Sequence, residues 1–144
     1  MLTKDKKWYR VTLRLMGDKL PIDEIESQLN LVASKIGRKG KHISDNPRYG
    51  KYRTNIWCSQ YLTSSDVPFE EQITILLNKL EPRTAQLEAI LVLPKIKAEL
   101  FLGFGSGNGQ GGATFSPELL MRIVKFNLTI SLDLYPPAFE KDEG

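Results

Sequence analysis

Apolar and polar residues alternate one by one in three stretches of the chain, residues 9–15, 95–102 and 127–134. The alternation is strictest in the last stretch, whose apolar set consists of Leu128, Ile130, Leu132 and Leu134. A period of two sends successive side chains to opposite faces of a β-strand. The pattern therefore predicts three strands, each with one face in a core and the other toward water or a partner.

Residues 53–62 predict a fourth strand. Trp57 and Tyr61 place aromatic side chains on its second face, so we expect this strand to be covered on both sides. The preceding segment, 34–52, is interrupted by glycines and an Asn-Pro pair. It predicts loops with a short strand near residues 39–43.

Apolar residues recur at helical spacing between the strands. Residues 21–29 predict a short helix whose apolar face contains Ile22, Ile25 and Leu29. Residues 69–80 predict a longer helix, with a capping cluster at 64–66. Its buried stripe consists of Phe69, Ile73, Leu76, Leu77 and Leu80.

Proline and serine mark the limits of the remaining helices. Pro82 should break or kink the longer helix, because proline lacks the backbone N–H and clashes with the preceding turn. A second helical stretch follows and stops by Pro94. A last helix is predicted after Ser116, which serves as its N-cap, with Pro117 at the first helical position. We expect that helix to be buried through Leu119, Leu120, Ile123 and Val124.

The order of these elements predicts an α+β fold. One-sided strands favour a mainly antiparallel, mixed sheet with helices packed on one face. We expect a ferredoxin-like plait with an additional αβ unit. Residues 1–136 should form a single domain, and 137–144 an acidic C-terminal tail.

Reactive side chains are scarce in the chain, which has one histidine, His42, and one cysteine, Cys58. A metal site needs several His, Cys or convergent carboxylate ligands, and a nucleophilic cysteine needs a base nearby. We expect Cys58 to be a buried structural thiol. The sequence therefore predicts a protein that is not an enzyme, with no catalytic residues, no metal and no cofactor.

The N-terminus, residues 1–7, is charged and lacks the apolar region of a signal peptide. No apolar run approaches the ~20 residues that a membrane-spanning helix needs. We expect a cytoplasmic protein that does not bind membranes.

Positive charge is concentrated in residues 35–53. This segment has seven basic residues and one acidic residue, whereas the rest of the chain has thirteen basic and sixteen acidic residues. Cations interleaved with aromatic rings suit nucleic acid, and the same cations suit an acidic protein partner. A solvated loop with its aromatic rings in the core is a third interpretation. The candidate binding residues of this segment are Lys35, Arg38, Lys39, Lys41, His42, Arg48, Tyr49, Lys51 and Arg53.

The polar faces of the alternating strands form a second candidate surface. If these strands are neighbours, Lys97, Glu99, Thr129, Ser131 and Asp133 share one face with two arginines. An open sheet face of this kind can bind another protein or a second copy of the chain. Its candidate binding residues are Trp8, Arg10, Arg14 and Phe101.

Residues 103–112 form a glycine-rich segment, predicted as a turn. Within it, residues 107–112 satisfy G-x-G-x-x-G, and Asp133 follows at the distance typical of a dinucleotide-binding motif. In that motif, however, the glycines themselves form the turn into the helix. Here residues 113–117 intervene, so a flexible loop is the simpler interpretation. A nucleotide-binding protein or an enzyme using this turn remains a third hypothesis.

Several short segments, taken in order, resemble a known bacterial family. The segments are a strand ending in Gly17-Asp18, the helix at 22–29, the basic stretch 37–41, Trp57, Ser64-Ser65-Asp66 before Glu70-Glu71, Leu80-Glu81-Pro82, residues 115–120, and the closing strand into Tyr135-Pro136. The family is the one catalogued as domain of unknown function 4279. The resemblance implies a compact α+β domain and implies no reaction.

These observations favour a binding protein, and a protein partner of the immunity or regulatory type comes first. Some small bacterial families serve as immunity proteins in toxin loci, which is an analogy and not a motif match. Binding of nucleic acid through residues 35–53 is the alternative.

Overall fold

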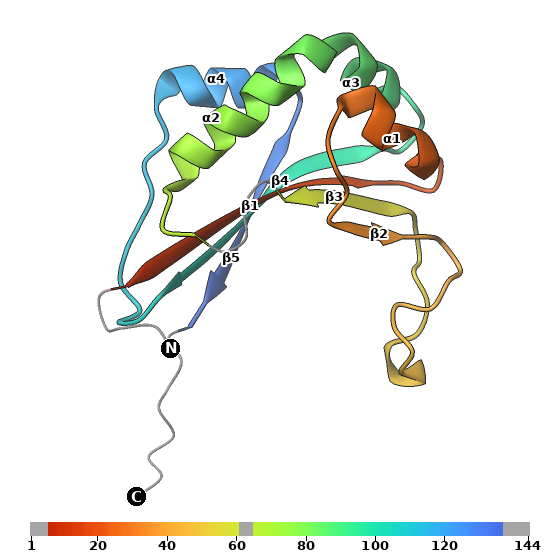
Figure 1. Ribbon diagram of the computed structural model, residues 1–144, viewed down its shortest axis with the longest axis horizontal. Helices are drawn as coiled ribbons and strands as arrows, with labels where there is room; N and C mark the ends of the chain where they lie inside the picture. Colours follow the sequence, from red (N-terminus) through yellow and green to blue (C-terminus); the bar gives the residue numbers. More distant parts are fainter. Residues whose placement is uncertain (1–5, 61–64, 137–144) are drawn as a thin grey trace, which may run out of the picture.

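The computed structural model describes residues 6–60 and 65–136. Its strands form one five-stranded sheet in the order β2-β3-β1-β4-β5, drawn in Figure 1. The strands are β1 (Lys7–Met16), β2 (Lys35–Gly37), β3 (Ile56–Gln60), β4 (Lys97–Ser106) and β5 (Thr129–Tyr135). The helices are α1 (Ile22–Leu29), α2 (Phe69–Leu80), α3 (Thr84–Leu91) and α4 (Pro117–Lys125), with the 3-10 turns η1 (Pro47–Tyr49) and η2 (Glu81–Arg83).

The sheet confirms the predicted α+β class. The four strands β2-β3-β1-β4 pair antiparallel, and β5 joins β4 in parallel, so the sheet is mainly antiparallel and mixed. β3, α2 and β4 form a split β-α-β unit with β1 inserted between its strands, which is the repeating unit of a ferredoxin-like plait. The additional αβ unit consists of α4 and β5.

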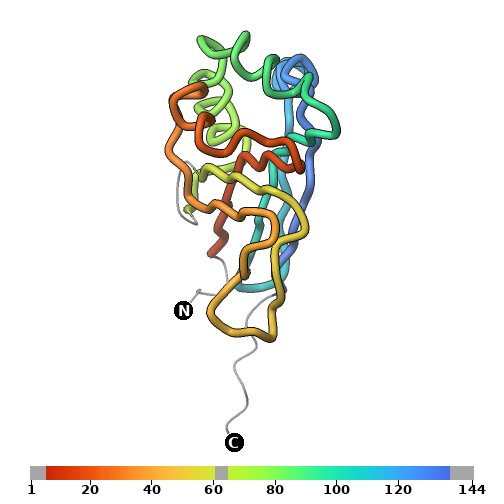
Figure 2. Tube along the Cα trace, turned by 90° about the vertical axis from the view of Figure 1, so that its right-hand side faces the viewer, coloured from red at the N-terminus to blue at the C-terminus, as the bar shows by residue number. Residues whose placement is uncertain are grey.

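The helices lie on one face of the sheet. In Figures 1 and 2 they form a layer above the strands, and the opposite face is left open. The prediction of helices on one face is therefore confirmed. No helix of the described residues is long and apolar enough to cross a membrane.

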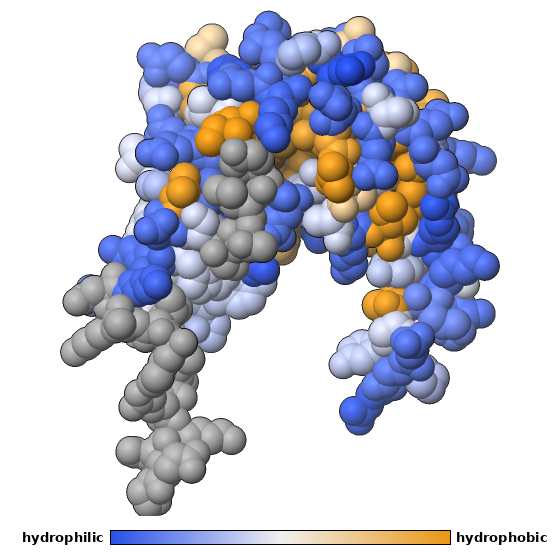
Figure 3. All heavy atoms as spheres, in the orientation of Figure 1, coloured by the Kyte–Doolittle hydropathy of each residue, from blue (hydrophilic) through white to orange (hydrophobic). Residues whose placement is uncertain are grey.

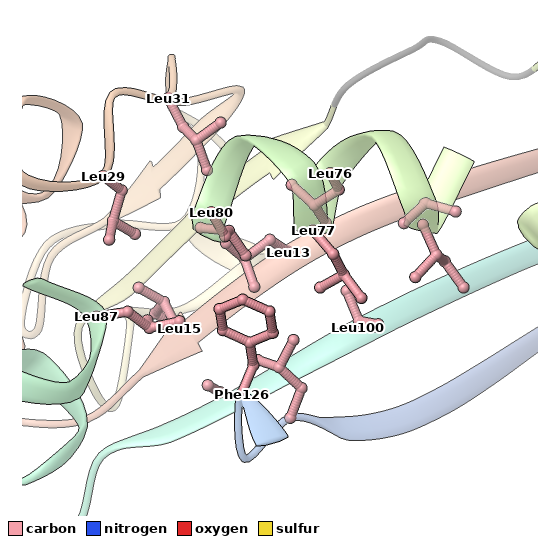
Figure 4. Packing of buried hydrophobic residues seen from close by; sticks show 14 of the residues in the cluster. Leu13, Leu15, Leu29, Leu31, Leu76, Leu77, Leu80, Leu87, Leu100 and Phe126 are labelled. Atoms are coloured by element: carbon pink, nitrogen blue, oxygen red, sulfur yellow. The ribbon is translucent and has the colours of Figure 1, made fainter. Parts of the chain in front are cut away.

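The core lies between the helical layer and the sheet. Leu13 of β1 and Leu100 of β4 are partners in the sheet, and both are fully buried under Leu77 and Leu80 of α2. Figure 4 shows these side chains converging, with Phe126 entering from the turn after α4. The alternation in β1 and β4 thus does what a period of two predicts, because their apolar sets face the helices.

The helix limits follow the local sequence signals. α2 ends at Leu80, and Pro82 stands in η2, which separates α2 from α3. Ser116 caps α4 as predicted, because its hydroxyl accepts a hydrogen bond from the backbone N–H of Leu119 at 3.2 Å. The expected cap of α2 is wrong for Ser65, whose hydroxyl instead accepts from the N–H of Val67. Ser64 lies outside the described residues.

The region before β3 differs from the prediction. The predicted short strand near 39–43 is wrong, because β2 comprises Lys35–Gly37. The ring of Tyr52 packs where a Cβ on Gly37 would lie. β3 begins at Ile56 and not at residue 53. Residues 54 and 55 dock instead on the turn after β1, where Thr54 donates to Asp18 at 2.8 Å and Asn55 donates to Leu20 O at 3.3 Å.

β3 is covered by helices on one side, and Cys58 on its open face is also buried. Trp57 is fully buried on the helical side, and the neighbouring Cys58 and Ser59 are buried as well. The predicted end of this strand, residues 61 and 62, lies outside the described residues, as does the acidic tail 137–144.

Two glycines that were predicted to belong to a turn are strand residues. β4 continues to Ser106, so Gly103 and Gly105 lie in the sheet opposite Arg10 and Trp8. Their missing side chains make room for those two residues, because a Cβ on Gly105 would lie 2.2 Å from Nε1 of Trp8. The loop proper therefore begins at residue 107.

The apolar faces of α4 and β5 are only partly buried, contrary to expectation. Leu119 and Ile123 face the core, but Leu120 and Val124 are exposed. On β5, Leu132 and Leu134 lie on the helical side and are 58% and 65% exposed. β5 is the edge strand, and the helical layer does not extend over it.

Candidate binding surfaces

The open face of the sheet carries an aromatic pair at one end. Trp8, Gly105 and Tyr135 stand side by side on β1, β4 and β5. The indole lies over the glycine and meets the Tyr135 ring at a centroid distance of 5.0 Å, with 49° between the planes. Gly105 therefore lets rings from two non-adjacent strands touch, which a side chain between them would prevent.

Arg10 occupies the next row of the same face. It stands opposite Gly103, which stands opposite Asp133. Its guanidinium carbon is 5.1 Å from the centroid of the Trp8 ring and 5.5 Å from that of Tyr135. A cation at this distance is attracted by the ring quadrupoles. The two rings and the guanidinium thus form one preassembled group, which we call the Trp8 cluster (Trp8, Arg10, Tyr135).

Asp133 completes the environment of this cluster. A hydrogen bond from the Tyr135 hydroxyl to the Asp133 carboxylate, followed by burial, raises the pKa of the phenol above its ordinary value. The hydroxyl donates and the carboxylate accepts, so loss of the phenolic proton would bring two negative charges together.

An ion pair occupies the other end of the open face. Arg14 pairs with Glu99 on the neighbouring strand, and the hydroxyl of Ser131 donates to Oε2 of Glu99 at 2.6 Å. Glu99 is only 8% exposed, and these two partners satisfy its carboxylate oxygens. The Arg14 guanidinium carbon also lies 4.4 Å from the centroid of the Phe101 ring.

Cys58 stands next to Arg14 in the sheet register and is buried. Burial is the main cause that raises the pKa of its thiol, and the positive charges of Arg14 and Lys35 act in the opposite direction. A thiol with a raised pKa is a weak nucleophile near neutral pH. Its position agrees with a structural role.

All basic residues of the segment except Lys35 lie on an arm, residues 38–55, that projects from the β2–β3 edge of the sheet. Figures 1 and 2 show it extending away from the helices, and Figure 3 shows a largely hydrophilic surface along it. Two cations at the base of the arm form ion pairs with residues outside it. Lys39 pairs with Asp18 at 2.7 Å, and Arg38 pairs with Asp23 at 2.6 Å. Lys39 and Thr54 donate to the Asp18 carboxylate, and these bonds lower its pKa.

The outer part of the arm has no such pairing among the described residues. Its backbone contains the β-bridge between His42 and Lys51 and the turn η1. Asn46 caps η1, because its Oδ1 accepts a hydrogen bond from the backbone N–H of Arg48. The side chains along it are exposed, and Tyr49 is 62% exposed. Within residues 6–60 and 65–136, no acidic side chain pairs with four cations of the arm: Lys41, Arg48, Lys51 and Arg53.

The structure therefore brings the predicted residues together in two groups. Trp8, Arg10, Arg14 and Phe101 share the open face as the alternation requires, and Lys35 joins them from β2 through its pairing with Cys58. Sequence reasoning missed Tyr135. The alternation could have identified it, because Tyr135 is two residues after Asp133 and four after Ser131 and therefore lies on the same face of the strand.

A pocket of about 510 Å³ lies on the other side of β5, beneath the glycine-rich loop. Phe69, Phe104, Leu132 and Leu134 line it together with Gly109 and residues 111–113. It is mainly apolar, and no described Lys or Arg side chain lines it. The loop also ends several residues before α4 begins, so its glycines do not form a helix N-terminus. This geometry gives no support to phosphate binding by the glycines.

Comparison with known proteins adds the family. A family model described as "Domain of unknown function (DUF4279)" matches residues 6–137. The chain belongs to this family. The resemblance noted in the sequence is thereby confirmed for the DUF4279 domain, whose match spans every strand of the sheet. No curated protein and no solved structure matches the chain.

The described part of this DUF4279 domain contains no group of three or more His, Cys, Asp and Glu residues placed to hold a metal ion. What the two surfaces offer is charge, aromatic rings and hydrogen-bonding groups in fixed positions.

Proposed function

We propose that this DUF4279 protein is a binding protein that recognises an acidic surface of another protein. The contact surface is the open face of the sheet, with the arm alongside it. The observation that carries the proposal is the Trp8 cluster, in which two rings and a guanidinium are assembled on a face that no helix covers.

The composition of this cluster favours a protein partner. Trp, Tyr and Arg are the side chains most enriched at the energetic centres of protein interfaces. Here they are held in place by contacts with one another and by the space above Gly103 and Gly105. Because the side chains are already ordered, binding costs less conformational entropy than it would for free side chains.

The distribution of charge indicates an acidic partner. On the open face, the carboxylate of Glu99 is occupied by Arg14 and Ser131, whereas Arg10 has no ion pair among the described residues. The four cations of the outer arm add positive charge on the same side of the molecule. Such a field attracts an acidic surface and raises the rate of association.

An immunity or regulatory role is the form of this function that we propose. In either role the protein acts by occlusion: a surface that is already assembled covers the active site or contact surface of its partner. No reaction by the DUF4279 protein itself is needed.

Nucleic acid is the second candidate, and one observation favours it. The open face carries three aromatic residues beside arginines, an arrangement that can stack bases. Against it, Trp8 and Phe101 already have guanidinium groups close to their rings, and Trp57 is in the core. Tyr49 is the most exposed aromatic side chain of the arm.

Site-specific photo-crosslinking in the native cell tests the proposal. A photoreactive amino acid is introduced at Thr12, on the open face, and in a control protein at Glu88, which is exposed on α3. We expect a protein adduct from position 12 that is absent from position 88. The Arg10→Glu change should abolish the adduct, whereas Arg83→Glu, in the helical layer, should leave it unchanged.

Treatment with nuclease separates the two candidates. A protein adduct that survives nuclease and weakens with added salt supports the proposal, since exposed charges are screened over about 10 Å at 0.1 M salt. Adducts with nucleic acid alone support the second candidate. Equal protein adducts from positions 12 and 88 would show that the open face is not the binding surface.

A further inference from the structure

β5 presents an apolar edge that nothing in the described residues covers. Its outer backbone edge pairs with no described segment, because β5 is the last strand in the sheet order. Ile130, Leu132 and Leu134 lie on its helical side, and all three are exposed. Three adjacent exposed aliphatic side chains on an open strand edge are a surface that favours association.

α4 also carries exposed aliphatic side chains. Arg122 of α4 faces α2, because its guanidinium donates to Asn78 at 2.8 Å. Leu120 and Val124 are two residues away on either side, so they point away from α2. Val124 is 74% exposed. α4 therefore exposes aliphatic side chains on its side away from α2.

The usual devices that protect an edge strand are missing from β5. Edge strands are commonly blocked by a lysine, a proline, a bulge or a very short length. β5 has seven residues, and none of them is lysine or proline. Its one charge, Asp133, is on the open face, where it accepts from Tyr135. Among the described residues, the edge is therefore open to pairing from Thr129 to Tyr135.

We propose that a second copy of this chain pairs with β5 through its own β5, in antiparallel orientation about Leu132. In this register each Leu132 lies opposite the other, and each Ile130 lies opposite Leu134 of the second copy. Apolar side chains then meet only apolar side chains on the helical face. On the open face Asp133 lies opposite Ser131, so no like charges face each other.

Other registers are worse. Centring the pair on Asp133 would place two carboxylates directly opposite, and centring it on Ser131 would leave Leu134 opposite Leu128, outside the strand. The Leu132 register pairs all seven residues. It also places Ile130 of the second copy beside Leu134, which lines the apolar pocket under the glycine-rich loop. In the pair, Ile130 of the second copy would therefore cover one side of this pocket.

The resulting dimer has one continuous sheet with both helical layers on the same side. An antiparallel pair related by a twofold axis perpendicular to the sheet keeps the two open faces together. The Trp8 clusters lie near this axis through Tyr135, so the dimer displays two of them on one surface. The inference concerns a surface separate from the proposed contact surface, and either can fail without the other.

Oligomeric state tests the proposal directly. Molar mass is measured by light scattering and sedimentation equilibrium from about 1 µM to about 1 mM protein. We expect the wild type to approach twice its monomer mass of 16.3 kDa as concentration rises. Leu132→Lys should remain monomeric, because it places two lysines opposite each other. Val92→Lys, at a still more exposed aliphatic position on another face, should dimerise like the wild type.

A disulfide experiment fixes the register and does not depend on the stability of the lysine variant. In a Cys58→Ser background, Leu132→Cys should form a covalent dimer under mild oxidation, because directly opposite residues of antiparallel strands lie within disulfide range. Val92→Cys should not. A wild type that stays monomeric up to about 1 mM, or crosslinking at position 132 no better than at position 92, would overturn the proposal. Crosslinking of position 132 only to a different protein would also overturn it.

Discussion

On the open face, the positions of Trp8 and Arg10 depend on the missing side chains of Gly105 and Gly103 opposite them. Gly105 provides the space in which the Trp8 indole lies, and the indole in turn contacts Tyr135 and Arg10. The alternation of the strands predicted which residues share this face. It could not predict that Gly103 and Gly105 belong to β4, because glycines that follow a strand are typical of a turn. The reason for a glycine at position 105 is the Trp8 ring of β1, which comes from a distant part of the sequence.

Gly105→Ala should disrupt the Trp8 cluster. The added Cβ would lie 2.2 Å from Nε1 of Trp8, so the indole must move away from the sheet. We expect greater quenching of tryptophan fluorescence by acrylamide and a loss of about 1–3 kcal/mol of unfolding free energy. Trp57 is fully buried and should stay unquenched. Gly112→Ala, where nothing lies within 4 Å of the added Cβ, serves as the control. Equal quenching of the two variants would contradict the predicted packing.

Tyr135 should titrate late. The hydrogen bond to Asp133 raises the pKa of the phenol, so Asp133→Asn, which removes the charge, should lower that pKa toward its ordinary value of 10.0. The Tyr135 signal is the difference in ultraviolet absorbance between the protein and its Tyr135→Phe variant. Because the folded pKa is raised, this contact stabilises the fold fully below about pH 10, and its contribution is lost as pH rises through the folded pKa. An unchanged pKa in Asp133→Asn would show that the carboxylate is not its cause.

At the scale of elements, the least predictable segment is the arm. Its turn residues were recognisable, but its attachment depends on contacts across the chain: Asp18 with Lys39 and Thr54, and Asp23 with Arg38. No local pattern reveals such partners. The same limitation explains α4 and β5, whose apolar faces were expected to be buried. Local periodicity identifies an apolar face, but it does not show how far the helical layer reaches.

Asp18→Ala should loosen the arm. The change removes the acceptor for Lys39 and Thr54, so we expect faster trypsin cleavage after the outer cations of the arm, Lys41 to Arg53. Asp45→Ala, within the arm and without a charged partner in the described residues, should leave the cleavage rate unchanged. The sheet should remain folded by circular dichroism in both variants. Equal cleavage rates would show that the pairing does not hold the arm.

The same attachment should depend on pH. Because the folded pKa of Asp18 is lowered from 3.8, the pairing is intact at neutral pH and is lost as pH falls through the folded pKa. An NMR titration of the Asp18 carboxyl carbon should therefore show a midpoint below 3.8. Lys39→Ala should move that midpoint upward, since Lys39 is the largest cause of the shift.

At the scale of the whole molecule, one core joins all the helices to one sheet. Leu77 is fully buried among side chains from the sheet and the other helices (Figure 4). Leu77→Ala should reduce the unfolding free energy by about 2–5 kcal/mol, measured by urea denaturation. Val92→Ala, at an exposed position, should change it by less than about 0.5 kcal/mol. We expect one cooperative transition, and separate transitions for different elements would contradict a single core.

The central place of β1 has a consequence for how the protein is made. β1 is synthesised before the other strands of the sheet, whereas its partner β4 is synthesised about 80–100 residues later. Until β4 is synthesised, one backbone edge of β1 has no hydrogen-bonding partner, even if α1 and β3 have already folded against it. The newborn protein therefore passes through a long interval without its native tertiary structure. We expect stalled fragments that end before Ser106 to depend on chaperones, and fragments extending past it to become resistant to proteases.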